Sequence, residues 1–299
     1  MSEPGTPTLD QLRVFLTVVE TGSFAGAARR LGRATSVISY AVANLEAQLG
    51  LALFDREGTR RPQLTVAGRA LLGDARTVAH GMDGLRARVR GLLGGLEAEV
   101  NLAVDVMLPT SRVVDALKAF QQEFPTVALR LHVEALGAVV QLVLDRTAVL
   151  GVSGPLVTGT DDLERIEVGM VELIPVARPD HPLASEAGTV PGAARHHVQL
   201  VLTDRSTLTE GRDFAVVATR TWRLADLGAK HALLLAGLGW GNMPAPMVAE
   251  DLWAGRLVRL RLAAGAADTY RFHAIYRTEA PPGPAAAWLL RRLLDQALG

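Results

Sequence analysis

The sequence predicts a mixed α/β chain in which a helical N-terminal part is followed by a long helix and then by a larger α/β part. Three observations lead to this prediction. Residues 23–49 show two short helices separated by a glycine, residues 71–92 repeat apolar side chains at alternating spacings of four and three, and residues after 95 alternate short apolar runs with helical stretches. The 299 residues, 49% of them hydrophobic, suffice for more than one buried core.

Residues 23–49 are predicted to form two helices joined by a tight turn. Ser23 is placed to cap the first helix, and Gly32 to end it in the left-handed conformation that glycine adopts readily. The second helix starts at once, with Thr35 or Ser36 as its cap. Its apolar stripe, at the spacing of one buried face, consists of Ile38, Val42, Leu45 and Leu49.

The face opposite that stripe is small and polar. It carries Ser36, Tyr40, Ala43 and Ala47, with Ser39 and Asn44 on its flanks. Solvated helix faces usually carry Lys and Glu, and packed faces carry larger apolar residues, whereas small polar side chains fit the floor of a DNA major groove. The pattern therefore indicates a helix-turn-helix DNA-binding motif, and a plain helical hairpin within a bundle is the alternative.

Residues 9–72 resemble the N-terminal domain of LysR-type transcriptional regulators. The matching residues are Leu9, Leu12, Phe15, Val19, Gly22-Ser23-Phe24, Ala27-Ala28, Leu31, Ser39, Leu45-Glu46, Leu49-Gly50, Leu53-Phe54, Arg56, Leu64-Thr65 and Ala67-Gly68-Arg69. The resemblance implies that the second helix is the recognition helix and that residues 54–56 lead into a β-hairpin wing. The chain has residues 34–36 as Ala-Thr-Ser where the family often has Ser-Gln-Pro, and Tyr40 where it often has Arg. These departures concern the base preference and not the fold.

We expect the recognition helix to contact base edges and phosphates, and the wing to contact the DNA backbone. The expected DNA-binding residues are Ser23, Arg33, Thr35, Ser36, Ser39, Tyr40, Asn44, Arg56, Arg60 and Arg61. Phosphate contacts should set affinity, and helix contacts should set specificity. Residues 1–95 hold 12 arginines against 8 acidic residues, whereas residues 96–299 hold 19 basic against 23 acidic residues. A surplus this small predicts weak binding by one copy, and hence two copies on a dyad-symmetric operator of double-stranded DNA.

Residues 65–93 provide a means of assembly. Their apolar seam consists of Leu71, Ala75, Val78, Met82, Leu85, Val89 and Leu92, and all of these except Ala75 are expected dimerisation residues. Glycines in the same segment weaken an isolated helix by about 1 kcal/mol each, so the helix is expected to depend on a partner. A helix packed on its own domain is the alternative. In the resembled family this is the dimerising linker helix, which implies a homodimer or homotetramer.

After residue 95 the pattern predicts a β-α-β-α-β unit, which builds a parallel sheet covered by helices. The expected strands and helices are strand 100–105, helix 112–124, strand 127–134, helix 138–144 and strand 148–152. Further expected elements are strands 173–178, 197–203 and 272–277 and helices 227–238 and 285–298.

This second part resembles, more loosely, the two-lobed, periplasmic-binding-protein-like regulatory domain of the same family. The matching features are residues 181–184, 237–241 and 243–244. The resemblance implies a winged helix-turn-helix DNA-binding domain at 1–65, a linker helix at 66–95 and an effector-binding domain at 96–299. Its first lobe would span about 96–160 and 267–299, and its second lobe about 161–266.

The cleft between the lobes is the expected effector site, because ligands of open α/β sheets lie beyond the carboxyl ends of the strands. The expected effector-binding residues are Asp105, Val106, Met107, Thr110, Leu136, Ser153, Thr203, Asp204 and Met243. Two carboxylates in this set favour a neutral, polyhydroxylated or cationic effector, held by charge-assisted hydrogen bonds to Asp105. The alternative is that Asp105 only caps the helix or pairs with an arginine.

The motifs indicate no catalysis, metal or cofactor. The chain has no cysteine, which excludes disulfides, thiol catalysis and cysteine-ligated zinc. Residues 151–154 lack the second glycine of a nucleophile elbow, the glycines of 237–241 do not join a strand to a helix, and the adjacent His196 and His197 point to opposite faces of a strand. A signal peptide and a long apolar run are absent, so we expect a cytoplasmic protein without membrane contact.

The sequence therefore predicts a ligand-responsive, sequence-specific DNA-binding regulator of transcription. Its expected partners are operator DNA, a small-molecule effector, further copies of itself and, by the resemblance, RNA polymerase. The alternative is a solute-binding module whose N-terminal helices serve only assembly, and the lack of an export signal argues against its usual form.

Overall fold

The computed structural model describes residues 5–55, 62–155, 162–262 and 268–295. It divides into two compact units, Met1–Arg90 and Gly91–Gly299. Each unit is built around its own hydrophobic core.

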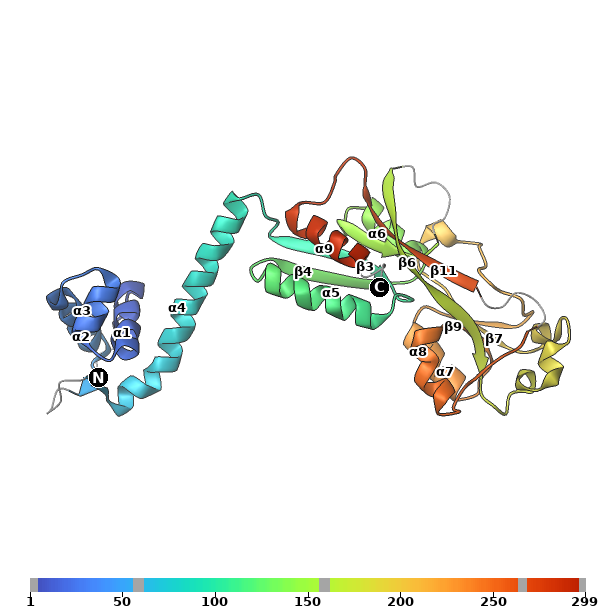
Figure 1. Ribbon diagram of the computed structural model, residues 1–299, viewed down its shortest axis with the longest axis horizontal. Helices are drawn as coiled ribbons and strands as arrows, with labels where there is room; N and C mark the ends of the chain where they lie inside the picture. The colour runs from blue at the N-terminus through green and yellow to red at the C-terminus, as the bar shows by residue number, and fades with distance from the viewer. Residues whose placement is uncertain (1–4, 56–61, 156–161, 263–267, 296–299) are drawn as a thin grey trace. The chain divides into compact units, whose positions relative to one another are not determined.

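The first unit contains three short helices, a two-stranded hairpin and most of a long helix (Figure 1). The elements are α1 (Leu9–Thr21), α2 (Phe24–Leu31), α3 (Thr35–Leu49), β1 (Phe54–Asp55), β2 (Gln63–Leu64) and α4 (Val66–Leu93). Strand β1 pairs antiparallel with β2, and the Phe54 ring packs against Phe15 and Phe24 at centroid distances of 5.5 and 5.7 Å. The hairpin is thereby anchored to the helices, and the predicted winged helix-turn-helix fold is confirmed.

The ends of α2 follow the prediction, whereas the start of α3 does not. Ser23 Oγ accepts a hydrogen bond from the Gly26 N–H at 3.0 Å, and Gly32 ends α2 with φ of 65°. The N-cap residue of α3 is Ala34, and no side chain caps this helix. The prediction of Thr35 or Ser36 as the cap was wrong because the helix already begins at Thr35, which places both hydroxyl groups inside the first turn.

The second unit is built on one seven-stranded sheet and a small parallel pair (Figure 1). Strand order in the sheet is β10-β6-β11-β5-β3-β4, and β9 also pairs with β6. The sheet strands are β3 (Glu99–Asp105), β4 (Ala128–Glu134), β5 (Leu150–Ser153), β6 (Leu163–Ala177), β9 (Gly241–Pro244), β10 (Val258–Arg259) and β11 (Asp268–Arg277), and the separate pair is β7 (Gln199–Leu202) and β8 (Thr221–Leu224).

Helices cover both faces of this sheet. They are α5 (Thr110–Glu123), α6 (Gly137–Leu144), α7 (Leu227–Leu235), α8 (Ala245–Trp253) and α9 (Pro284–Asp295), with short 3₁₀ turns at Pro182–Ala184, Glu186–Thr189, Ala193–His196 and Thr207–Thr209. Alternate residues of β3 face different helices, so Leu102 packs with α5 and α9 while Ala103 packs with α6. Strand β3 pairs in parallel with β4 and β5, which confirms the predicted β-α-β-α-β unit.

Other elements differ from the prediction. The strand predicted at 173–178 is only the end of the 15-residue β6, whose first ten residues are mostly exposed or partly buried and so lack an apolar run. Strand β11 starts four residues before its predicted position. Strands β8, β9 and β10 and helix α8 were not predicted. Each of these strands has two to four residues, too few for a periodicity to show.

Strands β6 and β11 form an antiparallel ladder from the pair Leu163–Arg277 to the pair Leu173–Asp268. The ladder has a register shift between Phe272 and His273, and Gly169, the partner of Phe272, has φ of 118°. Strand β5 pairs with β11 at one end of the ladder, and β9 and β10 pair with β6 at the other.

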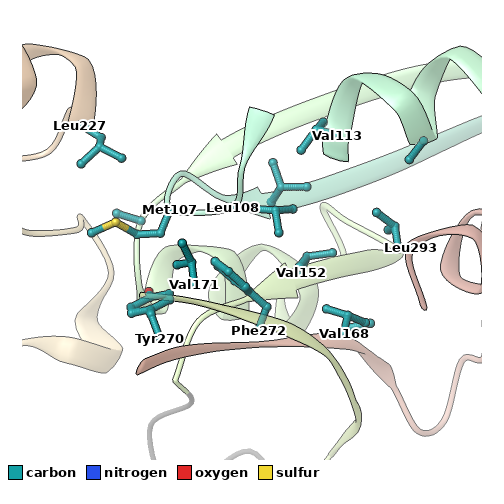
Figure 2. Packing of buried hydrophobic residues seen from close by; sticks show 14 of the residues in the cluster. Met107, Leu108, Val113, Val152, Val168, Val171, Leu227, Tyr270, Phe272 and Leu293 are labelled. Carbon is teal, nitrogen blue, oxygen red and sulfur yellow. The ribbon is translucent and has the colours of Figure 1, made fainter. Parts of the chain in front are cut away.

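The core of the second unit is continuous along this ladder. Figure 2 shows Val171 between Met107 and Tyr270, Phe272 beneath Leu108, and Val168 further along, on the side of Leu293. In the parts of the chain that the structure describes, we find no helix with the length and apolarity needed to cross a membrane.

Candidate DNA-binding face and effector cleft

The exposed face of α3 is the candidate DNA-binding face. Ile38, Val42 and Leu45 are buried in the core of the first unit, which directs Ser36, Ser39 and Tyr40 to the surface. Tyr40 is 69% exposed. Of the two residues predicted to flank this face, Ser39 is exposed and Asn44 is only partly exposed. The helix therefore presents hydroxyl groups and one aromatic ring, and no charged side chain, near its N-terminus.

The other predicted DNA-binding residues are placed differently. Arg33, just before α3, is exposed but makes two hydrogen bonds of 2.7 Å to the Asp10 carboxylate, which lower the pKa of Asp10. Ser23 uses its Oγ as the cap of α2. The expected wing arginines lie outside the described residues: Arg56, Arg60 and Arg61.

Sequence reasoning missed Val37 on this face. Its side chain is 47% exposed, next to Ser36 and one helical turn before Tyr40. Its signal was an apolar, β-branched residue outside the buried stripe. Such a side chain is suited to contact a thymine methyl group.

The predicted seam of α4 divides into two parts. Leu71 and Ala75 pack against the core of the first unit, and Met82 lies near Leu9 and Arg13 of α1. The remaining seam residues are about half exposed: Val78, Leu85, Val89 and Leu92. The alternative, a helix packed on its own domain, therefore describes the first turns of α4. The dimer contact of the later turns stays a prediction.

The lack of a side chain at Gly68 allows α4 to lie close to the backbone just before β1. A Cβ atom at this position would lie 2.2 Å from the backbone oxygen of Leu53, just before β1. Thr65 reinforces the junction, because its Oγ1 donates to the Ala52 oxygen and its N–H donates to the Leu53 oxygen. The start of α4 is thus fixed to the hairpin by close backbone contact.

Three hollows lie at the carboxyl ends of β3, β4 and β7 in the second unit. The first, here named the central cavity, measures about 310 Å³. Its lining residues are Met107, Leu136, Pro155, Leu173, Gln199, Leu200, Val201, Leu202, Asp213, Phe214, Ala215, Lys230, Asn242, Thr269 and Tyr270. A second hollow of about 590 Å³ adjoins it through shared residues such as Leu136 and Phe214, and a third of about 330 Å³ shares Met107.

The predicted effector residues distribute unevenly over these hollows. Met107 and Leu136 line the central cavity. Thr203 and Asp204 line the second hollow, and Val106 and Thr110 line the third. The three remaining residues line none of them, because their side chains are turned into the protein: Asp105, Ser153 and Met243.

Asp105 is an internal junction between four segments. Its carboxylate accepts hydrogen bonds from the Met107 N–H at 2.8 Å, the Leu136 N–H at 3.3 Å and the Tyr270 hydroxyl at 2.8 Å, and Gly154 adds a backbone donor. Burial raises the pKa of Asp105 to about 6, and the hydrogen bonds oppose that rise.

These contacts correct the hypothesis for Asp105. At 1% exposure, with its oxygens already bonded, the carboxylate cannot reach a ligand in the cavity. It does not cap α5, whose N-cap is Pro109, and among the described residues it has no arginine partner. Gly154 is required here, because a Cβ atom at that position would lie 2.0 Å from the Tyr270 hydroxyl oxygen.

Leu136 holds an unusual backbone conformation where the central cavity meets the second hollow. Its φ of 50° and ψ of −124° fall in a region that non-glycine residues rarely adopt. Its N–H donates to Asp105, and the next residue, Gly137, approaches Ser206 so closely that a Cβ atom would lie 2.5 Å from the Ser206 Oγ. Asp204 is likewise occupied, because it accepts from Ser206 and Thr209.

Lys230 is the residue of this site that sequence reasoning missed. It lies on α7, lines the central cavity, is 3% exposed and donates from Nζ to the Asn242 backbone oxygen at 2.7 Å. Burial lowers its pKa to about 8. The available signal was its spacing, since Lys230 shares one helix face with the buried Leu227 and Leu234.

The fold and these faces define a winged helix-turn-helix DNA-binding protein with an attached α/β ligand-binding domain. Residues 9–69 match the family model "Bacterial regulatory helix-turn-helix protein, lysR family", and residues 93–298 match the model "LysR substrate binding domain". The chain therefore belongs to the LysR family. It is a DNA-binding transcriptional regulator with an effector-binding domain.

Individual relatives are similar in sequence to this chain over most of their length. The chain is 29% identical over 249 residues to the HTH-type transcriptional regulator AceR of Acinetobacter baumannii, covering 81% of this chain and 80% of AceR. It is 30% identical over 269 residues to the HTH-type transcriptional activator AllS of Klebsiella pneumoniae, covering 88% and 95%. The crystal structure of ArgP from Mycobacterium tuberculosis shares the fold, with a TM-score of 0.54, 22% identity and coverage of 99% and 98%.

Proposed function

We propose that this regulator binds dyad-symmetric operator DNA as a dimer or tetramer, and that a small molecule in the central cavity modulates its binding or activity. The observation that supports DNA reading best is the exposed face of α3, where buried apolar residues leave small polar side chains and Tyr40 at the surface. A helix face that only meets solvent would carry charged side chains there, and a face that packs against another helix would be buried.

The roles on DNA follow from this face. The first turn of α3 has no side-chain cap, so its N–H groups are available to a phosphate, while Thr35, Ser36, Ser39 and Tyr40 reach base edges. Arginines of the wing would hold the backbone. Arg33 donates two of its N–H groups to Asp10, whose negative charge offsets part of its attraction for a phosphate, so we assign it a smaller share of the affinity.

The assembly role is assigned to the later turns of α4. Leu85 and Val89 are 55% and 46% exposed, and they lie on the same side of the helix as Val78 and Leu92. Burying this stripe against a second copy would remove apolar surface from water and bring two DNA-binding units together. The linker helix at 66–95 would thus join a DNA-binding domain at 1–65 to the regulatory domain at 96–299.

The regulatory role is assigned to the cavity at the strand ends. Its lining comes from loops after β3, β4 and β5 on one side, and from β7, α7 and β9 on the other. These two sides correspond to a first lobe of about 96–160 and 267–299 and a second lobe of about 161–266. A ligand that touches both sides would favour one arrangement of the lobes. We further propose a cytoplasmic regulator that carries out no catalysis and acts on transcription through RNA polymerase.

The test is genomic footprinting of the protein in cells, with and without candidate metabolites, followed by binding of the purified full-length chain to the recovered fragments. We expect dyad-symmetric sites and an affinity that falls steeply with salt, because phosphate contacts release counterions. Ligand binding without specific DNA binding would instead favour a solute-binding module. Sites without dyad symmetry would contradict binding as a symmetric dimer.

A further inference from the structure

Lys230 is a buried charge without an opposite charge. The chain has 29 arginines but only two lysines, Lys118 and Lys230, and Lys230 is 3% exposed. Among the described residues its Nζ makes one hydrogen bond, to the Asn242 backbone oxygen, and no ion pair. The buried carboxylate of Asp251, by contrast, contacts both His231 and Arg256. An ammonium group has three N–H donors, so Lys230 has two donors without a protein acceptor in the described parts of the chain.

The surroundings of Lys230 leave room for a ligand group and offer it a second contact. Lys230 packs against Gly241, where a Cβ atom would lie 3.1 Å from the Lys230 Cε and 2.7 Å from the Leu200 backbone oxygen. The Oδ1 atom of Asn242 is buried and has no hydrogen-bond partner among the described residues. Both side chains line the central cavity. The cavity therefore contains an ammonium group and a side-chain amide whose hydrogen-bonding capacity is not fully used.

The other polar groups of the cavity are already satisfied. The Gln199 amide donates to the Ala215 oxygen at 2.8 Å and accepts from the Val217 N–H at 2.9 Å. Asp213 forms an ion pair with Arg223 at 2.7 Å, and Tyr270 donates to Asp105. Much of the remaining wall is apolar: Met107, Leu136, Leu173, Leu200, Leu202 and Phe214. The uncompensated charge in this wall is that of Lys230.

We infer that Lys230 anchors the effector, and that the effector carries a carboxylate group on an apolar body. The carboxylate accepts the two spare N–H donors of Lys230, and the Asn242 amide provides a further hydrogen bond if it is rotated to present its NH₂ group. The apolar walls enclose the rest of the molecule. Because burial lowers the pKa of Lys230 only to about 8, the side chain is mostly protonated at pH 7.

This inference rests on the proposed regulatory role of the cavity and names the class of its ligand. It replaces the neutral or cationic effector expected from Asp105 and Asp204. Neither carboxylate lines the central cavity, because Asp105 is buried behind it and Asp204 lines the second hollow, so neither one competes with Lys230 for contact with the ligand. Within the described wall, the balance of charge at the cavity favours an anion.

The experiment compares carboxylates with their neutral amides on the full-length chain. Phenylacetate and hexanoate are titrated calorimetrically beside phenylacetamide and hexanamide, which have the same apolar bodies. We expect each carboxylate to bind at least about tenfold more tightly than its amide, as expected for a charge-assisted hydrogen bond to a buried group. The Lys230→Met variant, which keeps the length of the side chain, should lose this preference. The Lys118→Met variant, changed on the exposed surface of α5, should keep it.

A second measurement does not depend on the folding of any variant. Because the chain has two lysines, lysine labelled with ¹³C at Cε gives two side-chain NMR signals in the unmutated protein. The carboxylates should move the Lys230 signal and leave the Lys118 signal in place. If neither carboxylate moves the Lys230 signal, or if amides bind as tightly as carboxylates, the inference is overturned. Specific DNA binding of the same preparation, measured in parallel, tests the proposed function separately from the ligand class.

Discussion

Replacing Asp105 with asparagine should remove a pH-dependent contribution to the stability of the second unit. Burial raises the pKa of this carboxyl group from 3.8 to about 6, although hydrogen bonds from the Met107 N–H and the Tyr270 hydroxyl oppose the rise. A tenfold difference in proton affinity between the folded and unfolded chain corresponds to about 1.36 kcal/mol. A group with these two pKa values therefore changes the free energy of unfolding by about 3 kcal/mol over the interval between them.

Whether the free energy of unfolding rises or falls with pH depends on which state, folded or unfolded, holds the Asp105 proton more tightly. Because the pKa is higher in the folded chain, protonation favours folding, and this contribution is fully present below a pH of about 4. It is lost as the pH rises to about 6 and stays constant above that value. The free energy of unfolding of the native protein, minus that of Asp105→Asn, should therefore fall by about 3 kcal/mol across this interval.

Urea unfolding followed by tryptophan fluorescence measures this difference. All four tryptophans lie in the second unit, so the signal reports that unit alone: Trp222, Trp240, Trp253 and Trp288. Asp115→Asn, a change of the same kind on the exposed surface of α5, is the matched control. A difference that stays level or increases between pH 4 and 6 would show that the hydrogen bonds outweigh the burial of Asp105, and the reasoning would fail.

Three further predictions concern the first unit and α4. Leu85→Asp combined with Val89→Asp should leave the fold of one copy intact, because both side chains are exposed in it. The double change should abolish dimers in sedimentation experiments, because it places charges in an apolar interface. Dimers that persist would contradict the assigned stripe. Tyr40→Arg should change the preferred bases in a selection from random DNA without a general loss of affinity, and an unchanged profile would place Tyr40 outside the groove. Gly68→Ala should destabilise the first unit by about 1–3 kcal/mol in thermal unfolding followed by circular dichroism, because its Cβ would meet a backbone oxygen before β1. Gly73→Ala, with open space around its Cβ, should instead stabilise α4 by about 0.5–1 kcal/mol, and equal effects at the two sites would refute the contact.

Periodicity predicted those elements in which one face is continuously apolar. Helix α3 follows its stripe because Ile38, Val42 and Leu45 reach a shared core, and β3 is recognisable because it is buried on both sides. The first ten residues of strand β6 were not predicted as a strand, because one of its faces there is largely exposed. The seam of α4 looked uniform in sequence, but its first turns find apolar partners in the same unit, which no local pattern reveals.

The sequence predicted some of the residues that line the central cavity, but not which polar groups face into it. The carboxyl ends of the strands located Met107 and Leu136 correctly at the cavity. The orientation of Asp105 depends on Tyr270, which is 165 residues further along the chain, so local sequence could not indicate that this carboxylate turns inward. Lys230 was missed for the opposite reason: a lysine in a helix is usually solvated, and only its spacing with Leu227 and Leu234 marks it as buried.

The β6–β11 ladder has a mechanical consequence for the second unit. Among the described strands, the part of the sheet with β3, β4 and β5 connects to the part with β9 and β10 only through these two strands. A rotation between the two parts must then twist a hydrogen-bonded ribbon, where a loop hinge would turn freely. The ribbon is weakest at Gly169, opposite the register shift at Phe272, because the ladder is interrupted there and glycine tolerates a wide range of backbone angles. A ligand that pulled the two parts together would have to twist this ribbon, and the resulting strain in the ladder would oppose that movement.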